Sequence, residues 1–209
     1  AVPYRLPAPR IAKTTVNTEA TTGNFEWQDN FSSTKLLSNW NTLGTVESNW
    51  YQLNPEQKSL RMQASANRLS GLAQPAFIAR RQQHMHFTAK VELQLPTAEK
   101  ISAGIAAFQS EAAHYYFGIQ RTGKSYQVFI EQTNKSTPKI IASINIPKAT
   151  LGKNITLSIT GNAGKISFSY YNKTGEPVTI LKDADATLLS TEVAGGFVGT
   201  YLGMHARTE

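Results

Sequence analysis

Apolar and polar residues alternate along most of the chain in short runs, and turn residues separate the runs. In one run, Val91, Leu93 and Leu95 fall on one face, and charged or amide side chains fall on the other. A period of two is typical of half-buried strands. The runs with this pattern are 90–95, 154–160 and 165–170. Turn signals rich in Gly, Asn and Lys lie at 122–124, 161–164 and 172–175. The pattern predicts many antiparallel strands joined by hairpins.

These strands predict an all-β fold, a jelly-roll sandwich of two antiparallel sheets. The 209 residues are enough for one large sandwich. Several prolines and a Thr-rich stretch indicate that residues 1–24 form a linker or lead-in segment, or a strand donated to a neighbouring domain. We therefore place the sandwich module at 25–209. Brief helical pieces are expected only near Thr34–Asn39 and Asp183–Leu189.

Composition and charge exclude several classes of function. The chain has no cysteine, which excludes disulfides, thiolate metal sites and a cysteine nucleophile. No run approaches the roughly 18 apolar residues that a membrane span requires, so we expect no membrane partner. The net charge of +7 raises the question of nucleic acid, but the basic residues are scattered. Only Arg80–Arg81 and Lys148–Lys153 are concentrated, and neither interleaves with stacking aromatic residues. We expect a solvated basic surface and no nucleic-acid partner.

Catalytic chemistry has little support in the residue pattern. A glycosidase needs two carboxyl groups facing each other across the sugar, and Glu92, Glu111 and Asp183 lie in strand-face or turn positions typical of solvated surface. His84 and His86 could share a strand face as metal ligands, but no spacing signals a third ligand. No nucleophile elbow, phosphate loop or dinucleotide fingerprint occurs. We expect a chain that is not an enzyme by itself.

Sugar binding fits the alternation better. In the segment His114–Arg121, one face carries His114, Tyr116, Gly118 and Gln120. The next strand turns Phe129 outward, and an aromatic ring beside amides and a small residue suits a pyranose face. The alternative is that Tyr116 and Phe129 pack under a loop or belong to a second layer. The candidate substrate-binding residues on these strands are His114, Tyr116, Gln120 and Phe129.

The stretch Phe77–Ala89, FIARRQQHMHFTA, carries an unusual polar load for a strand. Its polar residues include Arg80, Arg81, Gln82, Gln83 and His84. They could lie on a solvent face, or they could be buried and hydrogen-bonded to one another. A functional alternative is a surface that faces a sugar or another domain. We expect a structural polar cluster.

Two long stretches resemble a known family. Phe77–Ala89 resembles the signature strand of the β-sandwich module at the C-terminus of family 43 glycoside hydrolases, the β-xylosidases and α-L-arabinofuranosidases. This module is also classed as carbohydrate-binding module family 91. Leu188–Ala206, LLSTEVAGGFVGTYLGMHA, resembles the closing segment of the same module. Shorter matches are Asp29–Phe31 with Leu36 and Trp40, Trp50–Leu53, Leu60–Met62 and Ala103–Gln109.

The resemblance implies a concanavalin-like jelly roll that follows a five-bladed β-propeller. In that family the propeller carries the catalytic carboxylates and the module packs on it. An aromatic residue near the end of the module closes one side of the sugar pocket, and the matching position is Phe197 in the GGFVG motif. The glycines around Phe197 would let a loop project its ring at low steric cost. The alternative is that Phe197 is a core residue of the last strand.

The chain also departs from the family pattern. The family often has Arg-x-Pro after the tryptophan that matches Trp40, whereas this chain has Leu43–Gly44–Thr45. The family usually continues into a final strand rich in Asp and Phe, and the sequence stops at Glu209. This difference predicts either an excised fragment or a last strand supplied from elsewhere. Some relatives hold a structural calcium ion near the termini, and Asp29 is the matching candidate ligand.

The expected function is a non-catalytic module that binds xylan, arabinoxylan or xylo-oligosaccharides, or completes the sugar pocket of a catalytic β-propeller in the same or a longer chain. One alternative is a stand-alone jelly-roll hydrolase acting on sugars. Another is a purely structural domain that stabilises its propeller. Because polymeric xylan lies outside cells, we expect an extracellular or periplasmic location.

Overall fold

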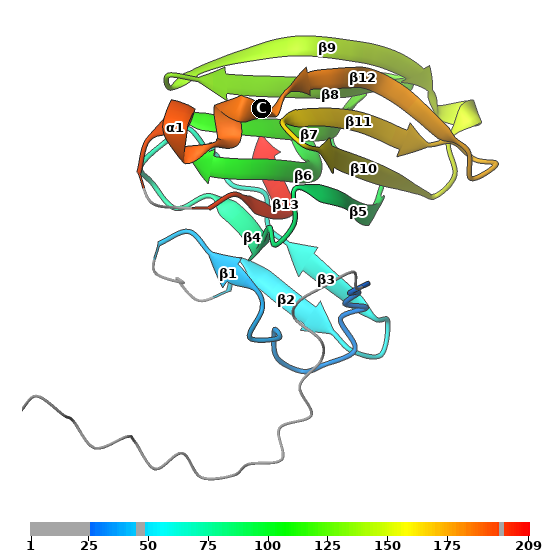
Figure 1. Cartoon of the computed structure of the whole chain (residues 1–209). Helices are drawn as coiled ribbons and strands as arrows, with labels where there is room; N and C mark the ends of the chain where they lie inside the picture. Colours follow the sequence, from blue (N-terminus) through cyan, green and yellow to red (C-terminus); the bar gives the residue numbers. More distant parts are fainter. Residues whose placement is uncertain (1–25, 45–48, 197–198) are drawn as a thin grey trace, which may run out of the picture.

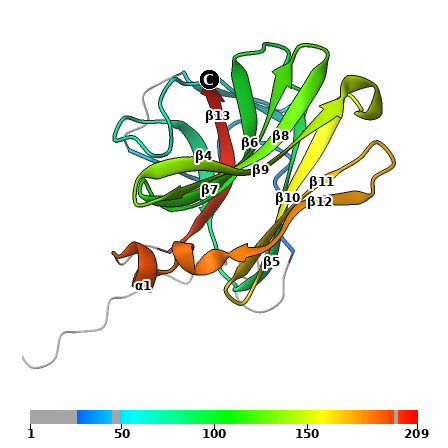
Figure 2. The ribbon, with the colours of Figure 1, turned by 90° about the horizontal axis from the view of Figure 1, so that it is seen from above.

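The computed structural model describes residues 26–44, 49–196 and 199–209, and the two large sheets there form an antiparallel sandwich. The seven-stranded sheet consists, in spatial order, of β1 (Asn41–Thr42), β4 (Ala76–Arg81), β13 (Tyr201–Thr208), β6 (Ile101–Ser110), β7 (Ala113–Thr122), β8 (Ser125–Asn134) and β9 (Thr137–Pro147). The four-stranded sheet consists of β12 (Pro177–Asp185), β11 (Lys165–Tyr171), β10 (Asn154–Asn162) and β5 (His86–Gln94). Figure 2 shows the two sheets as separate layers. The predicted jelly-roll sandwich is confirmed.

A small hairpin lies outside the two large sheets. It consists of β2 (Tyr51–Asn54) and β3 (Ser59–Met62), which pair in antiparallel register. Figure 1 shows this hairpin below the sandwich and near β1, at the beginning of the described chain. The hairpin and its flanking loops therefore add a third layer at one side of the seven-stranded sheet.

The alternating runs become strands at the predicted places. The runs at 90–95, 154–160 and 165–170 lie in β5, β10 and β11, and the predicted turns join β7 to β8, β10 to β11 and β11 to β12. The strand β10 lies between β5 and β11, with Leu157 opposite Val91 on one side and Tyr170 on the other. Pattern and register agree because one face of each strand is buried.

The helical predictions are only partly right. The segment 34–39 is bends and a turn, so the predicted helix there is wrong; a hydrogen bond from Trp40 N to Leu37 O closes this turn at 3.0 Å. In the segment 183–189, Asp183 and Asp185 end β12, and a short 3₁₀ helix, η2 (Ala186–Leu189), follows. The other short helices are η1 (Lys148–Thr150) and α1 (Thr191–Ala194). In the described ranges, no helix is long and apolar enough to cross a membrane.

The main hydrophobic core fills the space between the two sheets. Tyr115, Phe117 and Ile119 of β7 face Phe168 of β11 and its neighbours across this space. The helix η2 closes one end because Leu188 and Leu189 are buried in the same cluster. At about 25 cal/mol per Å² of buried apolar area, such a core is the main source of stability.

A second apolar cluster lies on the opposite face of the seven-stranded sheet. Its buried members are Leu69, Phe77, Ala79, Ala106, Phe108, Tyr116 and Phe129. Leu69 comes from the loop between the hairpin and β4, so this loop covers part of the sheet face. Both faces of β7 and β8 are therefore buried. Alternate side chains along these strands pack into the main core and into this second cluster.

Candidate functional site

The two stretches that carry the family resemblance are neighbours in space. The strands β4 and β13 pair antiparallel, with Arg81 opposite Tyr201 and Ala76 opposite Ala206. Just beyond this register, Gln82 N donates a hydrogen bond to Thr200 O at 2.9 Å. The polar stretch after Phe77 and the segment after Leu188 therefore meet at one end of the sandwich.

The loop between α1 and β13 begins with two glycines whose conformation suits only glycine at low cost. Gly195 has a φ of 78° and Gly196 a φ of 73°, in the left-handed region. Gly195 ends α1, and its N–H donates to Thr191 O. The side chain of Gln109 reaches from β6 and donates from Nε2 to Gly195 O at 2.9 Å. The first turn of the loop is thus tied to the large sheet.

The far end of the loop lies against Arg81. A Cβ placed on Gly199 would lie 3.0 Å from Arg81 Nε and 3.1 Å from Arg81 Nη2, so the guanidinium lies on bare backbone. The next residue, Thr200, donates from Oγ1 to Leu189 O at 3.1 Å. Phe197, between these two anchored ends, lies outside the described residues. Its role in closing a sugar pocket stays a prediction.

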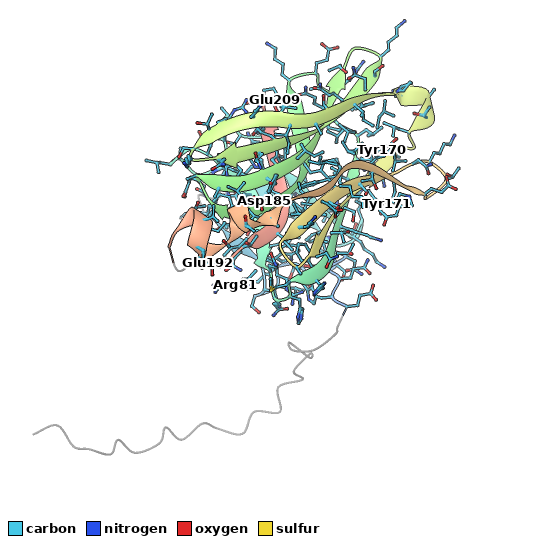
Figure 3. All side chains as sticks on the ribbon, turned by 45° about the horizontal axis from the view of Figure 1, so that its top comes forward. Arg81, Tyr170, Tyr171, Asp185, Glu192 and Glu209 are labelled. Atoms are coloured by element: carbon cyan, nitrogen blue, oxygen red, sulfur yellow. The ribbon has the colours of Figure 1, made fainter. Side chains whose placement is uncertain are left out.

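Arg81 is the exposed cation beside this loop. Its guanidinium carbon lies 6.0 Å from the ring centroid of Tyr201, the residue opposite it in the register. Within the described ranges, none of the ion pairs involves Arg81. In Figure 3, Arg81 and Glu192 appear at the lower side of the sandwich, far from Glu209 at the top.

The rest of the polar stretch forms local contacts at the surface. The guanidinium carbon of Arg80 lies 4.1 Å from the ring centroid of Trp27, and Arg80 Nη2 donates to Gln83 Oε1 at 3.2 Å. Gln82 Nε2 donates to His84 O at 2.9 Å. The structural role is thus supported by contacts, but the interpretation as a buried network is wrong, because Arg81 and Gln83 are exposed and the others are half-buried.

The two histidines of this stretch are not on one strand face. His84 lies in the irregular segment before β5, and His86 begins that strand. Among the described residues, no group of three or more His, Asp or Glu side chains comes together to hold a metal ion. The irregular segment breaks the alternation from which a shared face was inferred.

The predicted sugar platform on β7 and β8 is buried, so the prediction is wrong for its two aromatic residues. Tyr116 is 0% exposed and Phe129 is 1% exposed, with their rings edge to face at 5.6 Å. Gly118 lies under both rings, because a Cβ there would come 2.8 Å from Tyr116 and 2.9 Å from Phe129. The small residue beside the rings makes space for their packing. The alternative of a second layer is correct.

The polar members of the same face also lack the access that a ligand needs. His114 is 1% exposed and contacts Ser110 O through Nδ1 at 3.0 Å; burial lowers the pKa of this histidine. Gln120, at the other end of the strand, is half-buried and donates from Nε2 to Gln127 Oε1 at 2.7 Å. Of the four predicted binding residues on β7 and β8, only Gln120 is partly exposed to solvent. The four side chains do not form an open sugar site.

A buried charged cluster, which the sequence analysis missed, seals this face. Arg207 forms hydrogen bonds to both carboxylate oxygens of Glu131 and to Oε1 of Glu209, the last at 2.8 Å. Arg68 joins from the covering loop, with 2.9 Å between Nη2 and Glu209 Oε2. Burial alone would lower the pKa of Arg207, but the hydrogen bonds and charge of Glu131 raise it. The detectable signal was that Glu131 and Arg207 are the only Asp, Glu, Lys or Arg residues of their strands, β8 and β13.

Asp29 stabilises the beginning of the described chain. Its Oδ1 accepts a hydrogen bond from Phe31 N and its Oδ2 accepts one from Trp40 Nε1, each at 2.7 Å. The ring of Trp40 packs on Phe31 and Trp27. Both oxygens accept from N–H donors, and within the described ranges Asp29 belongs to no group of three or more His, Asp or Glu side chains. This set of partners does not fit a calcium site, and the calcium ion stays an untested prediction.

Comparison with known proteins gives consistent matches. A family model for the β-xylosidase C-terminal concanavalin A-like domain matches residues 28–209. A non-reducing end α-L-arabinofuranosidase from Bacteroides ovatus is 27% identical over 180 residues, which cover 86% of this chain and 33% of that protein. The crystal structure of a GH43_12 protein from a capybara gut metagenome aligns with a TM-score of 0.83 and 30% identity, over 90% of this chain and 35% of that one.

A xylan β-1,4-xylosidase from Bacillus halodurans has the same fold, with a TM-score of 0.76 at 20% identity over 91% of this chain and 38% of that chain. The chain thus spans about a third of the length of the proteins that it matches. The remaining two thirds of those proteins have no counterpart in these 209 residues.

Proposed function

Because this chain belongs to the family of β-xylosidase C-terminal concanavalin A-like domains, we propose that it is the non-catalytic module of a xylan-degrading enzyme. Its role is to complete the sugar pocket of a catalytic β-propeller with the loop at 195–199. The substrate is a xylose- or arabinose-containing chain, in keeping with the names of the xylosidase and arabinofuranosidase relatives. Such an enzyme meets its polymer outside the cell or in the periplasm.

The observation that carries this proposal is the anchoring of the loop by two other segments that match the family, 77–89 and 103–109. Gln109 holds Gly195, and Arg81 lies on Gly199. The described ends of the loop are therefore held, and the left-handed glycines restrict how the chain enters it. Preorganised positioning is how a non-reacting residue assists catalysis, because less motion is lost when the substrate binds. We propose that the residue positioned in this way is Phe197.

A stand-alone hydrolase receives no support from the acidic residues. Glu131 and Glu209, two acidic residues that share a partner, are both bound by Arg207. Glu131 is buried, and a buried carboxylate held by arginine cannot receive a sugar or a water molecule. The second candidate is a purely structural role, because Met85 and Val193 are 66% and 59% exposed on segments next to the loop and could pack on a propeller.

Calorimetric titration of the chain with xylo-oligosaccharides, arabinoxylan and cellulose oligomers tests the proposal. We expect saturable heat with the xylan ligands and a clearly reduced heat in Phe197→Ala. The matched control is Tyr171→Ala, which removes a half-buried ring from the four-stranded sheet and should leave binding unchanged. In a longer protein that contains the propeller, Phe197→Ala should raise the KM for xylobiose. Unchanged binding and an unchanged KM would leave only the structural role.

A further inference from the structure

A pocket lies between the residues that flank the hairpin β2–β3 and the loop that leads to β4. Its volume is about 580 Å³, which is in the usual range for small-ligand sites. The polar side chains in its wall are Asn49, Trp50, Gln63, Ser65, Asn67 and Gln74. Ser65 N donates to Ala206 O, so the pocket adjoins the end of β13 that is farthest from Tyr201. At about 3.3 Å per residue, Ala206 is roughly 17 Å from Tyr201, at the end of the strand that follows the loop at 195–199.

The wall of this pocket has no charged side chain. It presents four carboxamides, one hydroxyl and one indole. A carboxamide both donates and accepts, which matches a hydroxyl group, whereas a phosphate or carboxylate ligand calls for cationic partners. An aromatic ring among amides is also the usual environment of a sugar ring. The lining therefore selects a neutral, hydroxyl-rich ligand.

Hydrogen bonds within the wall hold the pocket in shape. Asn67 Nδ2 donates to Gln74 O at 2.9 Å and Asn67 N donates to Ser65 Oγ at 3.0 Å, which fixes the loop on one side. On the other side, Gln63 N donates to Trp50 O at 2.7 Å. A preformed wall reduces the conformational entropy that a ligand must overcome on binding.

Two donors of the wall lack acceptors. Trp50 Nε1 and Gln74 Nε2 are buried atoms with no hydrogen-bond partner among the residues that the structure describes. A buried donor without an acceptor is costly, so native structures rarely leave one without a ligand, water or protein partner. Because both atoms are covered in this state, their side chains must turn slightly toward a ligand to reach it. That turn exchanges two unsatisfied donors for two hydrogen bonds.

We propose that this pocket binds a neutral oligosaccharide of two or three rings. Trp50 Nε1 and Gln74 Nε2 donate to its ring or hydroxyl oxygens, and the carboxamides of Gln63 and Asn49 bind its outer hydroxyls. The pocket is a second sugar site, separate from the loop that carries Phe197. The choice of pentose probes rests on the proposed function, whereas the site itself rests on the pocket lining.

The test uses the full chain carrying Phe197→Ala, so that only the pocket is measured. Xylotriose, α-1,5-arabinotriose and cellotriose are titrated by calorimetry, together with tryptophan fluorescence, which responds when Trp50 turns. We expect saturable binding of at least one trisaccharide with a fluorescence change. Trp50→Phe keeps a ring but removes the N–H, and Gln74→Leu keeps the volume. Each is expected to weaken binding about fivefold.

The matched control is Gln52→Ala, which removes an exposed carboxamide of the same hairpin that does not line this pocket. It should leave the Kd unchanged. Near-UV circular dichroism confirms that each variant is folded. Absence of binding to all three trisaccharides, or equal Kd values for the parent, Trp50→Phe and Gln74→Leu, would overturn the proposal. Tighter binding of glucuronic acid than of the neutral sugars would overturn the ligand class. None of these results bears on Phe197, which is absent from the tested protein.

Discussion

Arg207 binds the carboxylate of Glu131 in a bidentate manner, with 2.6 Å from Nη1 to Oε1 and 2.9 Å from Nη2 to Oε2. The guanidinium carbon also lies 4.8 Å from the ring centroid of Tyr116. Arg207 is 2% exposed and Glu131 is 6% exposed, so the pair is removed from water. The pair joins β13 to β8 across two intervening strands. It explains why a face with aromatic residues and amides is closed to sugars.

Arg207→Met should therefore be strongly destabilising. It leaves the carboxylate of Glu131 buried with only the longer 3.4 Å contact to Arg68, and breaking a buried pair typically costs about 3–5 kcal/mol. The double variant Arg207→Met, Glu131→Leu should recover much of that loss, because no uncompensated charge remains. Urea unfolding of the parent, of the single variants Arg207→Met and Glu131→Leu, and of the double variant measures the coupling. Additive losses would contradict this account.

The free energy of unfolding should decrease as the pH falls below about 6.5, the ordinary pKa of histidine. Burial is the main reason why the pKa of His205 is lowered to about 3. The Nδ1 atom of this histidine lies 2.9 Å from Ala76 O. The unfolded chain binds this proton below about pH 6.5, whereas the folded chain does not. The stabilisation is therefore complete above pH 6.5 and decreases by roughly 1 kcal/mol per pH unit toward pH 3.

Thermal unfolding at pH 7.5 and pH 5 tests this dependence in the parent and in His205→Gln. The glutamine can still donate to Ala76 O but does not titrate, so the variant should lose less stability between the two pH values. Glu209 does not interfere in this range. Burial alone would raise its pKa, but the hydrogen bond and charge of Arg207 lower it. An equal loss in both proteins would show that His205 does not carry the effect.

The sequence pattern predicted the strands, but it did not predict the segments that cover them. Alternation reports that Tyr115 and Tyr116 point to opposite faces, and the structure confirms this. It does not report that Leu69, far away in the chain, covers the face of Tyr116. Burial on both faces depends on contacts between distant segments, which periodicity does not contain. The buried pair of Arg207 and Glu131 escaped detection for the same reason.

The sequence identified the segments of the candidate site, but it did not predict that they lie side by side. The wording of two stretches indicated the family, but no local signal placed Arg81 opposite Tyr201. The glycines before Phe197 indicated a projecting loop, and the positive φ values of Gly195 and Gly196 agree with that expectation. The pairing of β4 with β13 links segments more than a hundred residues apart, and register over such a separation is set by the whole sheet.

Gly118→Ala should destabilise the fold although alanine is usually tolerated in a strand. The new methyl group would meet the rings of Tyr116 and Phe129, both almost fully buried and unable to move aside. Overpacking of this kind costs about 1–3 kcal/mol. The control is Gly152→Ala at an exposed position, which should change the free energy of unfolding by less than about 0.5 kcal/mol. Equal stabilities of the two variants, measured in urea, would contradict the packing argument.

Asp29→Ala should cost about 2 kcal/mol, because Phe31 N and Trp40 Nε1 both lose a charged acceptor. Asp29→Asn should cost about half as much, since its single oxygen can satisfy one of the two donors. Thermal unfolding with and without EDTA accompanies the series. The donor set predicts that EDTA leaves the Tm of the parent unchanged. A fall in Tm with EDTA that is absent in Asp29→Asn would instead establish the calcium ion.

Substitution of the neighbours Arg80 and Arg81 should affect the free energy of unfolding and the binding of xylo-oligosaccharides differently. Arg80 lies on Trp27 and donates to Gln83, so Arg80→Ala should lower the free energy of unfolding by about 1 kcal/mol through the lost ring contact. Arg81 is exposed and lies on Gly199 at the foot of the loop. Arg81→Ala should change stability by less than about 0.5 kcal/mol.

The binding of xylo-oligosaccharides should respond in the opposite order. Arg81→Ala removes the contact with Gly199 and should weaken binding severalfold, because the end of the loop is then less well ordered before the ligand binds. Arg80→Ala should bind as the parent does. Calorimetric Kd values together with urea unfolding decide the matter. If Arg80→Ala weakens binding while Arg81→Ala does not, the contact between Arg81 and Gly199 does not position the loop, and the segment around Trp27 would be the surface that faces the sugar.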